Sequence, residues 1–110
     1  MEFNIDGKVV ETDSEGYLTD LNQWSEALAA AIADKEGLQL DEPHWEVINF
    51  LRTSFHDTGT VPNMRQLTKA FTKAFGPEKG SSKYLYGLFP YGPAKQACRI
   101  GGLPKPTGCV

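Results

Sequence analysis

Apolar side chains recur at three- and four-residue spacing along most of this chain, and Gly or Pro follows each such stretch. This spacing places the apolar side chains on one face of a helix, so it predicts a series of short amphipathic helices. A chain of 110 residues buries enough surface for one modest core but not for two domains. The predicted apolar faces are Leu21, Trp24, Leu28 and Ile32; Trp45, Ile48, Leu51 and Phe55; Met64, Leu67, Phe71 and Phe75; and Tyr84, Leu85, Leu88 and Phe89.

Short polar side chains mark where each predicted helix begins, because they accept hydrogen bonds from the free N–H groups of a first turn. Gly37 ends the first helix, and Leu38 can fold back onto its last turn. A fifth, shorter helix over residues 93–99 would place Cys98 in its last turn. The predicted caps are Thr19 or Asp20, Asp41, Asn63, and Ser81 or Ser82.

The N-terminus carries a different signal, a turn between two short apolar runs. Asp6-Gly7 separates residues 3–5 from residues 8–10, and Asp-Gly accepts the positive φ angles of a two-residue hairpin turn. We therefore predict an α+β fold that is mostly helical. It is a winged-helix-like orthogonal helical bundle over residues 1–100 with a small N-terminal β-hairpin, followed by a flexible C-terminal arm over residues 101–110.

The arm has an unusual composition. Its ten residues include three glycines and two prolines, which predicts a mobile segment and not a packed element. Cys109 lies within it, and Cys98, the other cysteine of the chain, lies three residues before it. An exposed thiol next to the chain end predicts reactivity, and the segment between the two cysteines spans at most about 35 Å when extended. The arm could therefore carry Cys109 into another protein's active site or fold back to Cys98.

Two thiols in these positions indicate sulfur transfer or redox chemistry by thiol exchange. Cys109 would carry a sulfur atom, and Cys98 would resolve the product. Arg99 and Lys105 favour the thiolate form of a nearby cysteine, whereas the Val110 carboxylate opposes it at Cys109.

Charge is divided unevenly between the two halves. Residues 1–61 carry a net charge of −10 and residues 62–110 a net charge of +7. This asymmetry predicts either an anionic partner at the C-terminal half or two halves that face each other within the fold. Three basic side chains would guide the arm toward an anion such as sulfite or toward an acidic partner surface, or would serve only solubility: Lys95, Arg99 and Lys105.

Residues 98–110 read Cys-Arg-Ile-Gly-Gly-Leu-Pro-Lys-Pro-Thr-Gly-Cys-Val, with ten residues between the cysteines and the second cysteine penultimate. This segment resembles the C-terminal arm of the DsrC family, the so-called gamma-subunit proteins of dissimilatory sulfite reductase. That family is related to the sulfur-relay protein TusE of tRNA thiolation. The resemblance extends over nearly the whole chain, including Gly16-Tyr17-Leu18 and the helical middle.

The resemblance implies a cytoplasmic sulfur carrier of dissimilatory sulfur metabolism, a protein co-substrate and not a stand-alone enzyme. Cys109 would carry sulfur as a persulfide or receive it at the siroheme site of sulfite reductase, and Cys98 would join it in a disulfide or trisulfide. The chain itself would bind no cofactor. The implied partners are the catalytic subunits of dissimilatory sulfite reductase, sulfur-relay donor proteins and a membrane-bound disulfide-reducing complex. The TusE branch keeps only the penultimate cysteine, so Cys98 favours the sulfite reductase branch.

Two other functions compete with this one. Two helices over residues 41–75 with a short Gly-containing turn resemble a helix-turn-helix, which suggests a winged-helix DNA-binding regulator. An ordinary solvated helix face would explain the same pattern. A metal site built from both cysteines and both histidines is disfavoured by their spacing, and capping or surface positions suffice for His44 and His56. The DNA contacts would be Arg65, Gln66, Lys69 and Lys73.

Aromatic side chains fall into two groups. Those on helical stripes, Trp24, Trp45, Phe71 and Phe75, are predicted to lie in the core. Three tyrosines before the arm would form its seat or a partner interface: Tyr84, Tyr86 and Tyr91.

No stretch of about 18 apolar residues and no secretory signal is evident, which predicts a protein of the cytoplasm that does not insert into a membrane.

Overall fold

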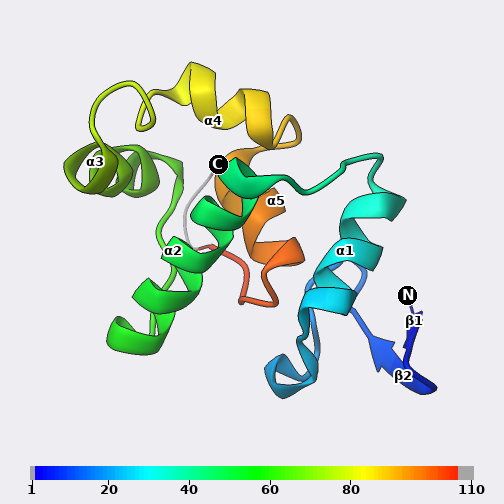
Figure 1. The fold of residues 1–110 in the computed structure, drawn as a ribbon. Helices are drawn as coiled ribbons and strands as arrows, with labels where there is room; N and C mark the ends of the chain where they lie inside the picture. Colours follow the sequence, from blue (N-terminus) through cyan, green and yellow to red (C-terminus); the bar gives the residue numbers. More distant parts are fainter. Residues whose placement is uncertain (1, 107–110) are drawn as a thin grey trace.

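The computed structural model describes residues 2–106, and it is mostly helical with one small sheet, as the sequence predicts (Figure 1). Among these residues, no helix has both the length and the apolar character needed to cross a membrane. The elements in chain order are β1 (Glu2–Ile5), β2 (Lys8–Glu11), the 3-10 turn η1 (Leu21–Gln23), α1 (Glu26–Lys35), α2 (Glu42–Thr58), α3 (Met64–Phe75), α4 (Ser82–Leu88) and α5 (Pro93–Ile100).

Helix α5 is the central element of the fold. It packs against α1, α2, α3 and α4, which lie around it in Figure 1. Its small side chains Ala94 and Ala97 are buried, and their size lets the neighbouring helices approach closely. Because α5 is central and ends at Ile100, the residues that follow it begin in the middle of the molecule, close to Cys98.

The N-terminal hairpin forms as predicted. β1 pairs with β2 in antiparallel register, with Phe3 opposite Val10. Asp6 (φ 50°) and Gly7 (φ 81°) form the two-residue turn between the strands. The hairpin packs against α1 and lies at the opposite end of the molecule from α3 (Figure 1). It therefore does not flank α3 as the wing of a DNA reader would.

The first helix differs from the prediction. Asp20 caps only the 3-10 turn η1, and the Trp24 backbone is extended (φ −68°, ψ 142°). α1 then begins after Ser25, whose hydroxyl accepts a hydrogen bond from the Leu28 N–H. The interruption lets the Trp24 indole turn toward Ile100, a contact across 76 residues that no local pattern announces.

The other helix boundaries agree with the sequence. Asp41, Asn63 and Ser81 cap α2, α3 and α4. At the end of α1, Gly37 (φ 76°) and the hydrogen bond from the Leu38 N–H to the Ala33 carbonyl form a Schellman motif. Capping chemistry is local, so its boundaries could be predicted residue by residue.

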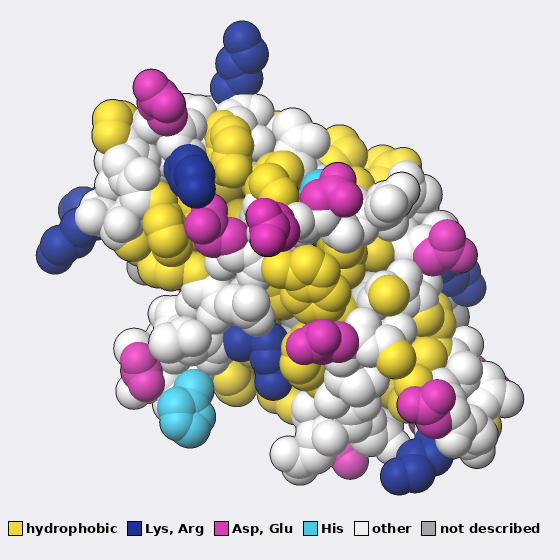
Figure 2. Space-filling model, viewed as in Figure 1, with side chains coloured by type: hydrophobic (Ala, Val, Ile, Leu, Met, Phe, Trp, Pro, Cys, Tyr) yellow, Lys and Arg dark blue, Asp and Glu magenta, His cyan; other side chains and the backbone are white. Residues whose placement is uncertain are grey.

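Phe75 is the exception among the aromatic residues predicted to lie in the core. Phe71 is buried and Trp24 and Trp45 are partly buried, whereas Phe75 is 41% exposed. It sits at the last turn of α3, 4.5 Å from Phe71 between ring centroids, and lines an open groove of about 700 Å³. On the face shown in Figure 2, acidic side chains border exposed apolar surface.

Candidate functional site

Cys98 lies in the last turn of α5, where the sequence places it, and its side chain is completely buried. Burial raises the pKa of its thiol from an ordinary 9.0 to about 12, because a thiolate in apolar surroundings loses its hydration. The neighbouring Arg99 favours the thiolate, as expected from sequence, but its effect is smaller than that of burial. Cys98 is therefore a protonated, protected thiol at neutral pH.

Arg99 is held by residues of α5 and of the α1 terminus. Its Nε and Nη2 donate to the two carboxylate oxygens of Glu36, at 3.2 and 3.0 Å. The fully buried Gln96 donates to the same carboxylate at 2.9 Å. The Tyr17 hydroxyl is buried close to Arg99, and among the described residues it has no hydrogen-bond partner. Burial raises the pKa of Tyr17. This network fixes α5 against α1 beside Cys98.

The first residues after α5 are packed, although the sequence predicts that a flexible arm begins there. Gly102 (φ 67°) and the 2.9 Å hydrogen bond from the Leu103 N–H to the Cys98 carbonyl form a second Schellman motif. Leu103 is only 2% exposed, and Pro106 is buried. Residues 101–106 are therefore part of the folded body, and we call them the arm root. Cys109 and the rest of residues 107–110 lie outside the described residues.

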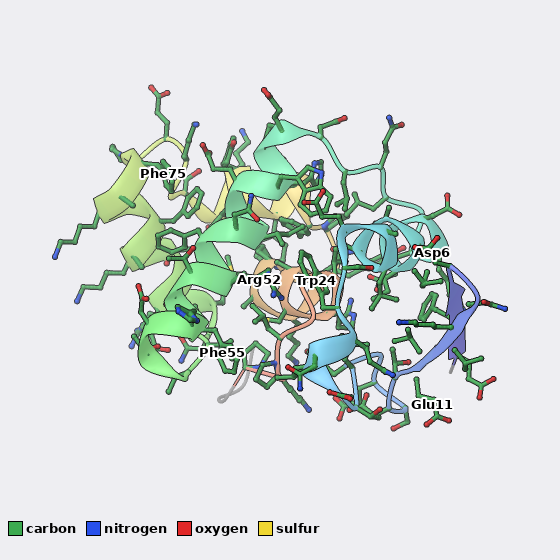
Figure 3. All side chains as sticks on the ribbon, turned by 60° about the horizontal axis from the view of Figure 1, so that its bottom comes forward. Asp6, Glu11, Trp24, Arg52, Phe55 and Phe75 are labelled. Carbon is green, nitrogen blue, oxygen red and sulfur yellow. The ribbon has the colours of Figure 1, made fainter. Side chains whose placement is uncertain are left out.

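Two side chains from distant elements close over the arm root. The Trp24 indole N–H donates to the Ile100 carbonyl at 2.9 Å, and Arg52 Nη1 of α2 donates to the Gly101 carbonyl at 2.6 Å. The Arg52 guanidinium stacks on the Trp24 ring, 3.7 Å from its centroid. Figure 3 shows the two side chains meeting beside α5. We call this pair the clasp.

The basic residues predicted to guide the arm are mostly engaged within the fold. Arg99 pairs with Glu36, and Lys105 pairs with Glu15 at 2.7 Å; Lys95 lies half-buried on α5. A third ion pair joins Lys79 to Glu46. Each of these ion pairs among the described residues connects the basic half of the chain to the acidic half. The charge asymmetry thus reflects, in part, two halves that face each other.

The residues of the DNA-binding alternative lie on α3. Arg65, Gln66, Lys69 and Lys73 are all exposed there. The side chain of Gln66 is already used, because it accepts a hydrogen bond from the Asn63 N–H in the capping box. α3 therefore presents a basic stripe of Arg and Lys side chains, without a hairpin beside it.

The histidines occupy opposite ends of α2. His44 is buried and caps the helix: Nδ1 accepts from the Asp41 N–H, and Nε2 lies 3.0 Å from the Leu88 carbonyl oxygen. His56 is exposed in the last turn. Within residues 2–106, no three His, Cys, Asp or Glu side chains come together as metal ligands would.

The three tyrosines predicted to form the seat of the arm or a partner interface differ in exposure, and Tyr84 is partly buried against the core. Tyr86 and Tyr91 are 43% and 66% exposed, on α4 and just before α5. The side chains that hydrogen-bond to the backbone at residues 100–101 are those of Trp24 and Arg52, which the sequence analysis did not single out for this role. One sequence pattern could have predicted that the arm root is packed. Gly102-Leu103 repeats Gly37-Leu38, the pair that predicts a helix end at which the next residue folds back onto the last turn.

Comparison with known proteins gives consistent matches. The family model described as "DsrC like protein" matches residues 4–110. A sulfurtransferase TusE of Yersinia pseudotuberculosis is 52% identical over all of both chains. The solution structure of Allochromatium vinosum DsrC is 54% identical (TM-score 0.89), and the crystal structure of the oxidized gamma-subunit of dissimilatory sulfite reductase (DsrC) from Archaeoglobus fulgidus is 43% identical (TM-score 0.85), each covering all of both chains.

Proposed function

The chain belongs to the DsrC-like family of sulfur-carrier proteins, and from this premise we propose that it is a cytoplasmic sulfur carrier of dissimilatory sulfur metabolism. In this proposal Cys109 carries the sulfur and Cys98 resolves the loaded form. The protein acts as a co-substrate of dissimilatory sulfite reductase, at whose siroheme site the arm delivers or receives sulfur. A donor of persulfide sulfur and a membrane-bound disulfide-reducing complex complete the proposed partners.

The observation that carries this proposal is the presence and position of Cys98. It lies eleven residues before Cys109, at the end of the central helix from which the arm leaves. A relay that only passes sulfur along needs one thiol, whereas formation of an intramolecular link needs a second within reach of the first. A carrier whose loaded sulfur is released by its own second cysteine fits this arrangement.

The burial of Cys98 determines the order of the two steps, loading and resolution. A buried thiol with a pKa near 12 has almost no thiolate at neutral pH and is unreactive while the fold is closed. Loading therefore falls to Cys109. Cys98 reacts afterwards, once its side chain is exposed and its proton has gone to solvent or to a base.

A second candidate function is sulfur relay for tRNA thiolation. It is favoured by relatives named sulfurtransferase TusE, which are as similar to this chain as the DsrC protein of Allochromatium vinosum. In that function Cys109 would act alone, and Cys98 would be a buried packing residue. The two candidates therefore differ in what the loss of the Cys98 thiol does.

Intact-mass analysis with peptide mapping, after incubation with a persulfide donor, tests the proposal. We expect the wild type to gain sulfur at Cys109 and then to form a link between Cys109 and Cys98 that a reductant reverses. Cys109→Ser should gain none, and Cys98→Ser should load but form no link. Undiminished persulfide on Cys109→Ser would overturn the proposal. A wild type that loads and passes sulfur on without ever linking the two cysteines would favour the relay.

A further inference from the structure

The proposed function requires Cys98 to leave its buried position. In the closed fold no part of its side chain reaches solvent, and the Leu103 N–H bonds to its carbonyl. Leu103 itself is buried in the core. The last turn of α5 and the arm root must therefore separate from the body before Cys98 can react.

The clasp holds this region by two consecutive carbonyl groups. Trp24 bonds to the carbonyl of Ile100, and Arg52 bonds to that of Gly101. Carbonyls at a helix C-terminus have no partner within the helix, so these donors satisfy groups that would otherwise need water. Burial lowers the pKa of Arg52, but its guanidinium stays charged at neutral pH, which strengthens its bond to Gly101.

The clasp also fits closely over the arm root. A Cβ atom on Gly102 would lie 2.3 Å from Trp24 Cδ1, so the indole rests directly on the glycine backbone. The residues involved lie far apart in the sequence: Trp24 follows η1, Arg52 is in the middle of α2, and Gly102 follows α5. The clasp is thus a junction at which the N-terminal segment and α2 jointly hold the arm root.

The clasp is accessible from outside. Arg52 lines an open pocket of about 400 Å³ together with Phe55, His56 and Leu103, at the end of α2. A partner segment that enters this pocket would compete for the Arg52 guanidinium and displace Leu103.

We propose that Trp24 and Arg52 are positioning residues that gate Cys98: the closed clasp keeps the thiol buried, and its release frees the last turn of α5 for reaction. This inference rests on the proposed function only in treating Cys98 as a reacting residue. The gate itself is a property of the fold and can be measured without sulfur transfer.

The reaction of Cys98 after the clasp opens needs no external oxidant. After opening, the Cys98 thiol gives its proton to solvent, and the thiolate attacks the Cys109 sulfur of the persulfide. The Cys98–Cys109 disulfide forms, the sulfur–sulfur bond of the persulfide breaks, and hydrosulfide leaves with the electron pair. The persulfide is reduced and the Cys98 thiolate is oxidised.

Alkylation of Cys98 by iodoacetamide, followed by intact mass, measures gate opening. The protein is the full chain with Cys109→Ser, so that Cys98 is its one thiol. The clasp variants are Trp24→Phe, which loses the indole N–H and keeps an aromatic ring, and Arg52→Met, which loses the charge and keeps the stem. We expect each to raise the alkylation rate about 10- to 100-fold, the effect of losing a hydrogen bond of this kind. Arg52→Lys, which retains a cationic donor, should restore part of the protection.

Two controls separate the gate from general destabilisation. Trp45→Phe changes the other tryptophan, on α2, and should leave the alkylation rate unchanged. Leu67→Ala removes a buried side chain of α3 and should lower the unfolding midpoint without a comparable rise in alkylation under native conditions. Unchanged rates in both clasp variants would overturn the gate, as would equal acceleration by Leu67→Ala at matched stability. Failure of sulfur loading at Cys109 would overturn the proposed function and leave this result intact.

Discussion

Gly102 lies beneath the indole of Trp24 at a distance that leaves no room for a side chain: an added Cβ would lie 2.3 to 2.7 Å from three atoms of that residue. Its φ of 67° is also in the left-handed region. The close approach and the backbone conformation therefore both require glycine at the point where the arm root leaves α5.

Gly102→Ala should destabilise the protein by about 2–4 kcal/mol, the sum of left-handed backbone strain and overpacking against the indole. Gly37→Ala is the matched control. It occupies the same position of a Schellman motif, with φ 76°, but an added Cβ there meets nothing within 4 Å. Its expected cost is about 1 kcal/mol, from backbone strain alone. Urea unfolding of both variants measures the difference, and equal costs would contradict the close contact.

Cys98 should make the protein less stable at alkaline pH. Its pKa is about 12 in the folded state and near 9.0 when exposed, so between these values the unfolded chain releases a proton that the folded chain keeps. The free energy of unfolding should therefore fall by up to about 1.4 kcal/mol per pH unit above pH 9. Below pH 9 this contribution is fully present. Tyr17, whose pKa is also raised, acts in the same direction.

The measurement is a series of urea unfolding curves at pH 8, 9 and 10 in the presence of a reductant. Cys98→Ala is the control, because it keeps the other titrating groups and removes only this thiol. We expect the stability difference between wild type and Cys98→Ala to shift against the wild type as the pH rises. Parallel pH profiles would show that the Cys98 thiol ionises equally well in the folded state.

Glu36→Gln should destabilise the fold by about 1–3 kcal/mol, because it leaves the guanidinium of Arg99 without its carboxylate in a largely buried position. Glu46→Gln is the control, since it removes the pair with Lys79, which is more exposed than that of Glu36 and Arg99, and should cause little change. Thermal unfolding at low and moderate salt distinguishes the two pairs. Equal effects of the two substitutions would mean that the Glu36 pair contributes no more than a surface pair.

Leu103→Ala should cost about 2–4 kcal/mol, since the side chain is buried and its removal leaves a cavity. Val9→Ala, at a position that is 56% exposed, should change stability by less than about 0.5 kcal/mol. Urea unfolding measures both. A Leu103→Ala variant as stable as Val9→Ala would show that the arm root is not packed and would support the flexible arm predicted from residue 101 onward.

The sequence by itself determined the local structure and the chemical character of this protein. The hairpin turn at Asp6-Gly7, the caps of α2, α3 and α4 and the position of Cys98 near the end of α5 all follow from patterns a few residues long. The family resemblance followed from the arm, a contiguous stretch with specific spacing. Such features can be predicted from the sequence because the interactions that produce them connect residues that are close together in the chain.

Only the tertiary structure decided how Cys98 is held. The hydrogen bond of Trp24 reaches across 76 residues and that of Arg52 across 49, and no local pattern encodes either. The same holds for the burial that outweighs Arg99 at the Cys98 thiol and for the ion pairs that join the two charged halves. Desolvation depends on every element packed around a group, so the reactivity of a thiol in a central helix is a property of the assembled fold.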